Sequence, residues 1–119
     1  MATAALVLTA LILLLHVYFV LLETVLFKTR GRRVFGLTAE KAEIMAPAMS
    51  NQGCYNGFLV AALAVGLCHP NPEIANAFIV YGLLCITVAG IWGAVTVKKS
   101  ILYIQTLPAV IALGLHHFA

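Results

Sequence analysis

Four long apolar runs constrain this chain more than any other feature of its sequence. They cover roughly residues 4–27, 48–68, 73–95 and 100–117. Each run is close to the about 20 apolar residues that cross about 30 Å of hydrocarbon as a helix. Of the 119 residues, 63% are apolar and only 9% are charged, whereas about a quarter of the residues of soluble domains are charged. The sequence therefore predicts an all-α polytopic membrane protein, a four-transmembrane-helix bundle.

We expect one domain over residues 1–119, with helices at about 4–27, 39–67, 73–95 and 100–117. The second helix begins before its apolar run, because Thr38 is a suitable N-cap and Glu40 follows in the first turn. Pro47 either kinks this helix or begins the membrane span proper. The first run has no preceding basic residue and is too long for a signal peptide, so we expect it to remain as a helix.

All seven basic residues lie in two of the connections between apolar runs. The first connection holds Lys28, Arg30, Arg32, Arg33 and Lys41, and the third holds Lys98 and Lys99. Because Lys and Arg gather in cytoplasmic loops, both termini are predicted to be periplasmic or extracellular. The net charge of +3 indicates topology and an attraction to anionic membrane lipid, and it does not indicate nucleic acid as a partner.

A polar stretch from Ser50 to Gly57 begins the second apolar run. On a helix, Asn51, Gln52, Tyr55 and Asn56 fall in one arc of about 140°. Amide side chains are costly in hydrocarbon unless they are hydrogen-bonded, so we expect most of this turn to face protein.

Small residues follow the same helix at every fourth position. Gly53, Gly57 and Ala61 form a small-xxx-small ridge, which lets another helix approach closely. The ridge is equally compatible with packing inside the bundle and with a homo-oligomer.

The first run carries Thr9, His16 and Glu23 at intervals of seven residues, which places them on one helical stripe. Such a stripe is expected to face the bundle interior. Glu23 is either an interfacial acid that pairs with Lys28 or a nearby arginine, or a ligand, proton or catalytic group. For His16 we favour a hydrogen bond to a neighbouring helix.

These polar residues are predicted to meet in the cytoplasmic third of the bundle. The candidate ligand-binding residues are Glu23, Asn51, Gln52, Tyr55, Asn56, Gln105 and His16. They either hold the helices together or line a pocket that binds or transports a small polar or amphipathic ligand. We favour the pocket, because four amides and an acid exceed what the packing of four short helices requires.

No metal, cofactor or catalytic residue is predicted. Cys54, Cys68 and Cys85 stand singly, without the paired spacing of a zinc site or a redox motif. His116 and His117 end the last run and are expected to be solvated.

Three segments of the first half carry a family resemblance: HVYFVLLE at residues 16–23, RVFGL at 33–37 and NQGCYNGF at 51–58. Together they resemble a widespread bacterial family of small four-helix membrane proteins that is classed as a domain of unknown function and sometimes labelled epimerase. The resemblance implies the four-helix fold and the inner membrane, and it supplies no chemistry. The nucleotide cofactor usual for sugar epimerases requires a glycine-rich βαβ unit, which an all-helical chain does not contain.

Two weaker likenesses point to other functions. The chain is similar to the glutathione-dependent membrane enzymes of eicosanoid and detoxification metabolism in having four short helices, an arginine-rich first loop and a polar start to the second helix. It has no arginine within that span and no acid after Asn56 to match theirs. The length and the acid in the first helix resemble those of the small multidrug transporters.

Three functions stay open. One is ligand binding or transport, with Glu23 as a cation or proton site, although the nearly apolar outer half counts against transport. Another is an enzyme that acts on an amphiphile from the cytoplasmic leaflet, with Glu23 or His16 as general acid or base. Because those two lie about 10 Å apart along the helix, they cannot act on one atom directly. The third is a structural or accessory subunit.

Overall fold

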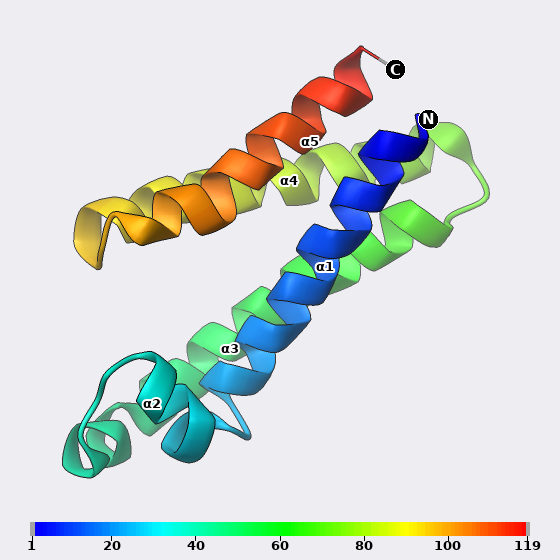
Figure 1. The fold of residues 1–119 in the computed structure, drawn as a ribbon. Helices are drawn as coiled ribbons and strands as arrows, with labels where there is room; N and C mark the ends of the chain where they lie inside the picture. The colour runs from blue at the N-terminus through cyan, green and yellow to red at the C-terminus, as the bar shows by residue number, and fades with distance from the viewer. Residues whose placement is uncertain (1, 119) are drawn as a thin grey trace. The chain divides into compact units, whose positions relative to one another are not determined.

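The computed structural model describes residues 2–118. Helices make up most of this range and no strand occurs in it, so the all-α prediction is confirmed (Figure 1). The elements are α1 (Thr3–Glu23), the π-helical η1 (Phe27–Gly31), α2 (Arg32–Val34), α3 (Ala39–Cys68), α4 (Pro72–Thr96), the π-helical η2 (Leu102–Thr106) and α5 (Leu107–His117). Within the described range, α1 and α4 are the two helices that are long and apolar enough to cross a membrane.

Capping residues fix where α3 and α4 begin. The Thr38 hydroxyl accepts the backbone N–H of Lys41 at 3.2 Å, as expected of an N-cap. The Asn71 side chain accepts the backbone N–H groups of Glu73 and Ile74 at 2.9 and 3.3 Å. Pro72 follows as the first residue of α4, a position where the missing N–H of proline removes no helical hydrogen bond.

Gly36 ends the short helix α2 through its backbone conformation. Its φ of 68° lies in the left-handed region, which glycine enters without a steric penalty. The Gly36 N–H reaches the carbonyl of Arg33 at 3.2 Å, and the Leu37 N–H reaches that of Arg32 at 2.9 Å. These paired bonds form a Schellman motif, which stops the helix and turns the chain toward α3.

Pro108 accounts for the π-helical turn before α5. Proline has no N–H and its ring clashes with the carbonyl four residues earlier, so a widened turn relieves the conflict. The Leu107 N–H accordingly bonds the carbonyl of Leu102, five residues back. In the same turn, the Thr106 hydroxyl donates to the Thr87 carbonyl of α4 at 3.0 Å. An added Cβ at Gly90 would overlap Thr106, so glycine permits this close contact between α4 and η2.

The described chain forms two compact units, one of residues 2–13 with 59–118 and one of residues 14–58. In the first, four helices share one apolar core. Its buried members are Ile12 of α1, Leu63 of α3, Ile79, Leu83 and Ile86 of α4, and Ala109 and Ala112 of α5. Figure 1 shows α5 returning alongside α4 in this unit. The expected organisation of residues 1–119 as a single domain stays a prediction.

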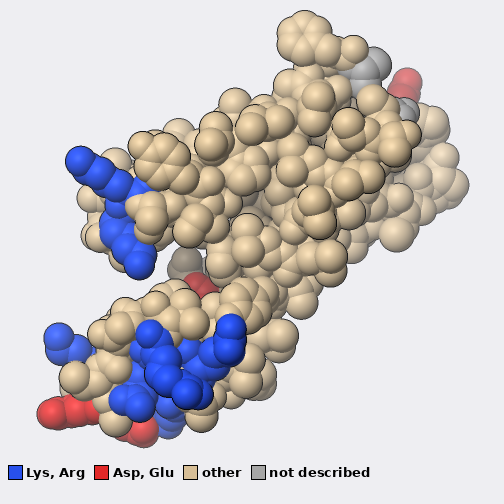
Figure 2. Space-filling view, in the orientation of Figure 1, with Lys and Arg blue, Asp and Glu red and all other residues tan. Residues whose placement is uncertain are grey.

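The second unit joins the end of α1, η1, α2 and the first half of α3. Leu22, Phe27 and Ala42 are each 1% exposed, and the ring of Phe27 lies 6.2 Å from that of Phe35. An added Cβ at Gly31 would overlap the carbonyl oxygen of Leu22, so only glycine fits there. The basic side chains of the first connection gather over this segment, as Figure 2 shows.

Two glycines of α3 lie in very different surroundings. Gly57 has no atom within 4 Å of an added Cβ, whereas at Gly66 that carbon would lie 3.0 Å from both the Ala75 oxygen and the Ile79 nitrogen. Gly66 permits the closer contact, because α4 follows the turn at the end of α3 and packs directly against Gly66.

Candidate functional site

The centre of the candidate site is a hydrogen bond between α1 and α3. The Asn56 side-chain amide donates to Oε1 of Glu23 at 2.5 Å. Glu23 is only 8% exposed, and the two other members of its stripe, Thr9 and His16, are 0% and 1% exposed. The stripe of α1 therefore faces inward as its spacing predicts, and Glu23 meets one of the amides that we expected it to contact.

Gly53 brings the two helices close enough for this bond. An added Cβ at Gly53 would lie 2.6 Å from Cγ2 of Thr24 and 3.2 Å from Cβ of Glu23. The Thr24 hydroxyl donates to the Val20 carbonyl at 2.6 Å, which fixes the side chain with its methyl group toward Gly53. Since Gly53 lies one turn before Asn56 on α3, this contact positions the amide opposite the carboxylate.

The nearby basic residues have other partners. Lys28 pairs with Glu43 at 3.0 Å. Nε of Arg30 donates to the Tyr18 hydroxyl at 2.6 Å, and its guanidinium lies 5.6 Å from the centre of that ring. Within residues 2–118, no Lys or Arg forms an ion pair with Glu23. The interpretation of Glu23 as a surface acid paired with Lys28 therefore does not describe this structure.

The other predicted site residues lie in different surroundings. Asn51, Gln52 and Tyr55 are exposed, so the expectation that most of this polar turn faces protein was wrong for these three side chains. In this unit, Gly53 and Asn56 of α3 contact α1.

Two further predicted residues are His16 and Gln105. His16 is buried, with its ring edge-on to Phe19 at 5.1 Å. Gln105 belongs to the other compact unit, and its contact with Glu23 stays a prediction.

A second polar pair was missed by the sequence reasoning. Nε2 of His116 lies 2.8 Å from the Thr9 hydroxyl, and that hydroxyl donates to the Ala5 carbonyl at 2.7 Å. His116 is partly buried and bonded to Thr9, so the expectation that both terminal histidines are solvated does not hold for this one. The sequence did contain a signal for this pair. The start of the first helix and the end of the last were predicted at the same membrane face, and Thr9 lies on the inward stripe.

The arrangement around Glu23 has the chemistry of a site for a cation or a hydrogen-bond donor. An ionised carboxylate only accepts hydrogen bonds and offers about four acceptor positions, of which Asn56 fills one. In the part of the chain that the structure describes, no group of three or more His, Cys, Asp or Glu side chains is arranged to hold a metal ion.

Fold and site together define an all-α protein with two helices able to cross a membrane and a buried acid where α1 ends against α3. The chain belongs to the family described as "Protein of unknown function (DUF1304)", whose model matches residues 10–117. The resemblance to a domain of unknown function is thereby confirmed. Neither the curated proteins nor the solved structures contain a match to this chain.

Proposed function

We propose that this protein is a four-span inner-membrane protein of the bacterial cell that binds, or transports, a small amphipathic cation at Glu23. The observation that carries the proposal is the hydrogen bond from Asn56 to a nearly buried carboxylate that has no basic partner within residues 2–118. Removing a carboxylate from water without a counter-charge costs several kcal/mol. Such a cost is typical of acids that serve a ligand, a proton or an ion.

The membrane part of the proposal rests on α1 and α4, with α3 and the η2–α5 segment as the two remaining spans. Helix α3 has 30 residues and is therefore about 45 Å long, enough to cross about 30 Å of hydrocarbon and extend beyond it. The basic residues of the two connections then lie in the cytoplasm.

Reporter fusions to the two ends test this arrangement, which predicts both ends outside the cytoplasm. A cytoplasmic C-terminus would overturn the four-span count.

The ligand class follows from the groups around the acid. A cation supplies the positive counter-charge that Glu23 has not received from a Lys or Arg within residues 2–118. The amides Asn51 and Gln52 are exposed on α3. An apolar body suits the surroundings, because the exposed surface of this helix also includes Tyr55 and Phe58, whose rings pack edge-to-face at 5.7 Å. A compact organic cation with an apolar body therefore fits better than a hydrated metal ion.

Binding of tetraphenylphosphonium to the purified protein in nonionic micelles tests this proposal. We expect Glu23→Gln to fold normally and to bind this cation at least about tenfold more weakly, because a buried charge interaction of about 1.4 kcal/mol or more is lost. Tetraphenylborate has the same shape and the opposite charge, so its binding should not favour the wild-type protein.

Glu43→Gln is the matched control variant. Glu43 is an exposed acid of the same compact unit, and its removal changes the net charge by the same amount. This control should bind the cation as the wild type does. Equal binding of the cation by the wild type and by Glu23→Gln would contradict the proposed function and leave the Glu23–Asn56 pair as a structural contact of an accessory subunit.

We also propose a homo-oligomer that uses part of the small-residue ridge on α3. Gly53 is covered by Thr24 and Glu23 of its own chain, so it is not free to contact a second copy. Gly57 has open space around it and Ala61 is exposed. An oligomer contact would therefore use Gly57 and Ala61, and Gly57→Leu should weaken it without unfolding the chain.

A further inference from the structure

The connection between α1 and α3 carries as much net charge as the whole chain. Residues 28–43 contain five basic side chains and two acidic ones, Glu40 and Glu43, a net charge of +3, and the net charge of the 119 residues is also +3. Figure 2 shows Lys and Arg side chains gathered together over this connection. We call its five basic residues the basic surface: Lys28, Arg30, Arg32, Arg33 and Lys41.

The protein itself neutralises little of this charge. Lys28 pairs with Glu43 at 3.0 Å. The side chains of Arg32, Arg33 and Lys41 form no ion pair and no hydrogen bond within residues 2–118. Arg33 and Lys41 are exposed, and Arg32 is partly exposed. The basic surface therefore keeps positive charge that a partner outside the chain can neutralise.

Arg30 is held in place by a neutral partner. Its Nε donates to the Tyr18 hydroxyl at 2.6 Å, and its guanidinium lies 5.6 Å from the centre of the Tyr18 ring. A guanidinium has five N–H groups, so this bond leaves those on the two terminal nitrogens for another acceptor. Arginine binds phosphate oxygens through two parallel N–H bonds of this kind. Because Tyr18 already orders the side chain, less conformational entropy is lost when a phosphate binds.

Exposed apolar side chains accompany the basic surface. Val34 and Phe35 directly follow Arg33, and they are 48% and 38% exposed. Basic side chains beside exposed apolar ones are typical of segments that lie at a membrane interface, where the charges meet head groups and the apolar groups enter the acyl region. A partner bound by charge alone would leave Val34 and Phe35 in water. The combination therefore favours a lipid as the anionic partner.

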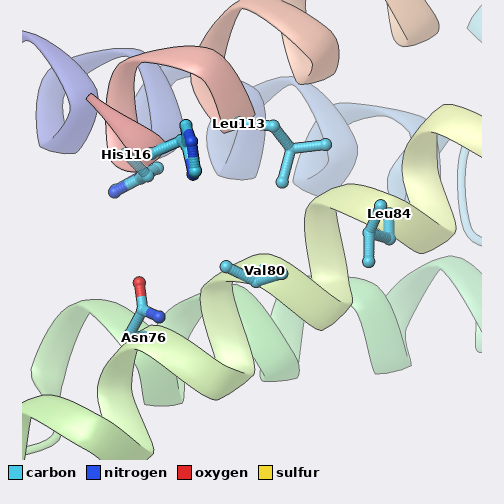
Figure 3. A pocket seen from close by; sticks show the side chains of 6 residues that line it. Asn76, Val80, Leu84, Leu113 and His116 are labelled. Atoms are coloured by element: carbon cyan, nitrogen blue, oxygen red, sulfur yellow. The ribbon is translucent and has the colours of Figure 1, made fainter. Parts of the chain in front are cut away.

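The groove between α4 and α5 has no comparable charge. Figure 3 shows Asn76, Val80 and Leu84 of α4 on one side of it and Leu113 and His116 of α5 on the other. The described residues that line this groove include no Lys or Arg, so a phosphate finds no permanent positive charge there. The basic surface, which belongs to the other compact unit, is the better site for an anionic head group.

In the four-span arrangement, the first connection lies at the cytoplasmic leaflet, whose anionic lipids attract Lys and Arg. We propose that Arg30, held by Tyr18, binds the phosphate of an anionic glycerophospholipid, while Arg33 and Lys41 supply the surrounding positive charge. This inference rests on the membrane arrangement of the proposed function and not on the carboxylate of Glu23. Loss of cation binding therefore leaves it standing.

The test is lipid binding to the purified full chain by native mass spectrometry, with phosphatidylglycerol and phosphatidylcholine that carry identical acyl chains. Both lipids contain a phosphate, but phosphatidylcholine also carries a positive nitrogen, which the basic surface repels. We expect the wild type to bind phosphatidylglycerol at least about tenfold more tightly, since each Lys or Arg near an anionic membrane surface contributes about fivefold. Arg30→Gln should reduce this preference about fivefold.

Tyr18→Phe tests the positioning role of the hydroxyl without changing any charge. The variant keeps the aromatic ring beside Arg30 and removes the acceptor of its Nε–H. The preference for phosphatidylglycerol should fall about twofold, because binding must then order one more side chain. Thermal stability should stay close to that of the wild type, because the bond is exposed. An unchanged preference in Tyr18→Phe would overturn the role of Tyr18.

Lys98→Gln is the matched control variant. Lys98 is an exposed basic residue of the other compact unit, and its removal changes the net charge by the same amount. This control should keep the preference of the wild type. Equal binding of the two lipids by the wild type would overturn the proposal and leave the basic surface to an acidic protein. Equal losses in Arg30→Gln and Lys98→Gln would also overturn it, and binding of neither lipid would contradict the membrane arrangement as well.

Discussion

Two of the polar pairs that α1 forms with other helices differ in charge: one joins Thr9 to His116, and the other contains the carboxylate of Glu23. In the first compact unit, the Thr9 hydroxyl donates to the Ala5 carbonyl and lies 2.8 Å from Nε2 of His116, so it has two partners within the protein. In the second, Glu23 receives one donor, from Asn56. The same seven-residue stripe turns both groups inward. The partner on the facing helix decides whether an inward polar group holds helices together or is available to a ligand.

The largest expected effect concerns the close contact of α3 in the unit of the neutral pair. Gly66→Leu places side-chain carbon against backbone atoms of Ala75 and Ile79, which cannot yield as a flexible side chain does. We expect a loss of about 3 kcal/mol in the free energy of unfolding. Gly57→Leu, in the unit of the charged pair, meets open space and should change stability by less than about 1 kcal/mol, since leucine also favours the helix.

Thermal unfolding of both variants in the same detergent, followed by circular dichroism, measures this difference. Equal losses of stability for Gly66→Leu and Gly57→Leu would mean that α3 is not packed more closely at Gly66 than at Gly57.

Gly53→Ala is expected to have the next largest effect, through the charged pair. The new methyl group would lie 2.6 Å from Cγ2 of Thr24, whose rotamer is fixed by its bond to Val20. We expect a loss of about 1–3 kcal/mol, together with weaker cation binding, because Asn56 moves away from Glu23.

Adding Thr24→Ser to Gly53→Ala should restore most of that loss. Serine keeps the hydroxyl that bonds Val20 and lacks the methyl group that meets the new side chain. Chemical unfolding of the single and double variants checks the rescue, and its absence would show that the helices are separated by some contact other than Thr24.

A smaller effect is expected from the neutral pair itself. A double-mutant cycle of Thr9→Val and His116→Ala measures the coupling between the two side chains, which we expect to be about 0.6–1.7 kcal/mol, the range typical of hydrogen bonds between helices in an apolar environment. A coupling near zero would mean that the bond contributes nothing to holding α1 against α5.

The smallest effect is expected at the exposed ion pair of the second unit. The side chains of Lys28 and Glu43 are 55% and 71% exposed, so solvent and salt screen their attraction. Lys28→Met should lower stability by at most about 1 kcal/mol, measured by thermal unfolding at low and high salt. A larger loss would indicate that Lys28 also neutralises Glu23, which would remove the contrast between the two pairs.

The sequence predicts those features that depend on local chemistry. The cap at Thr38 and the inward stripe of α1 follow from side-chain types and helical spacing. The partners across helices depend on the register between α1 and α3, which no local pattern fixes. Asn51, Gln52 and Asn56 share one polar arc, yet of these three only Asn56 lies one turn beyond Gly53, whose backbone is in close contact with α1.

The π-helical turns were not foreseen for a related reason. Pro108 signals a disturbed helix, but whether the helix kinks or widens depends on what packs beside it. Here Thr106 bonds α4 across the small residue Gly90, and that long-range contact favours the widened turn. In the same way, the open space at Gly57 and the close contact at Gly66 depend on the neighbouring helices and not on the glycine spacing.

The most direct test of the cation site is an experimental structure of the purified protein soaked with tetraphenylphosphonium. The proposed function predicts density for the cation against the carboxylate of Glu23, with Asn56 still donating to Oε1. Both oxygens of Glu23 satisfied by protein side chains, with no ligand density beside them, would contradict the account and leave this pair as a structural contact.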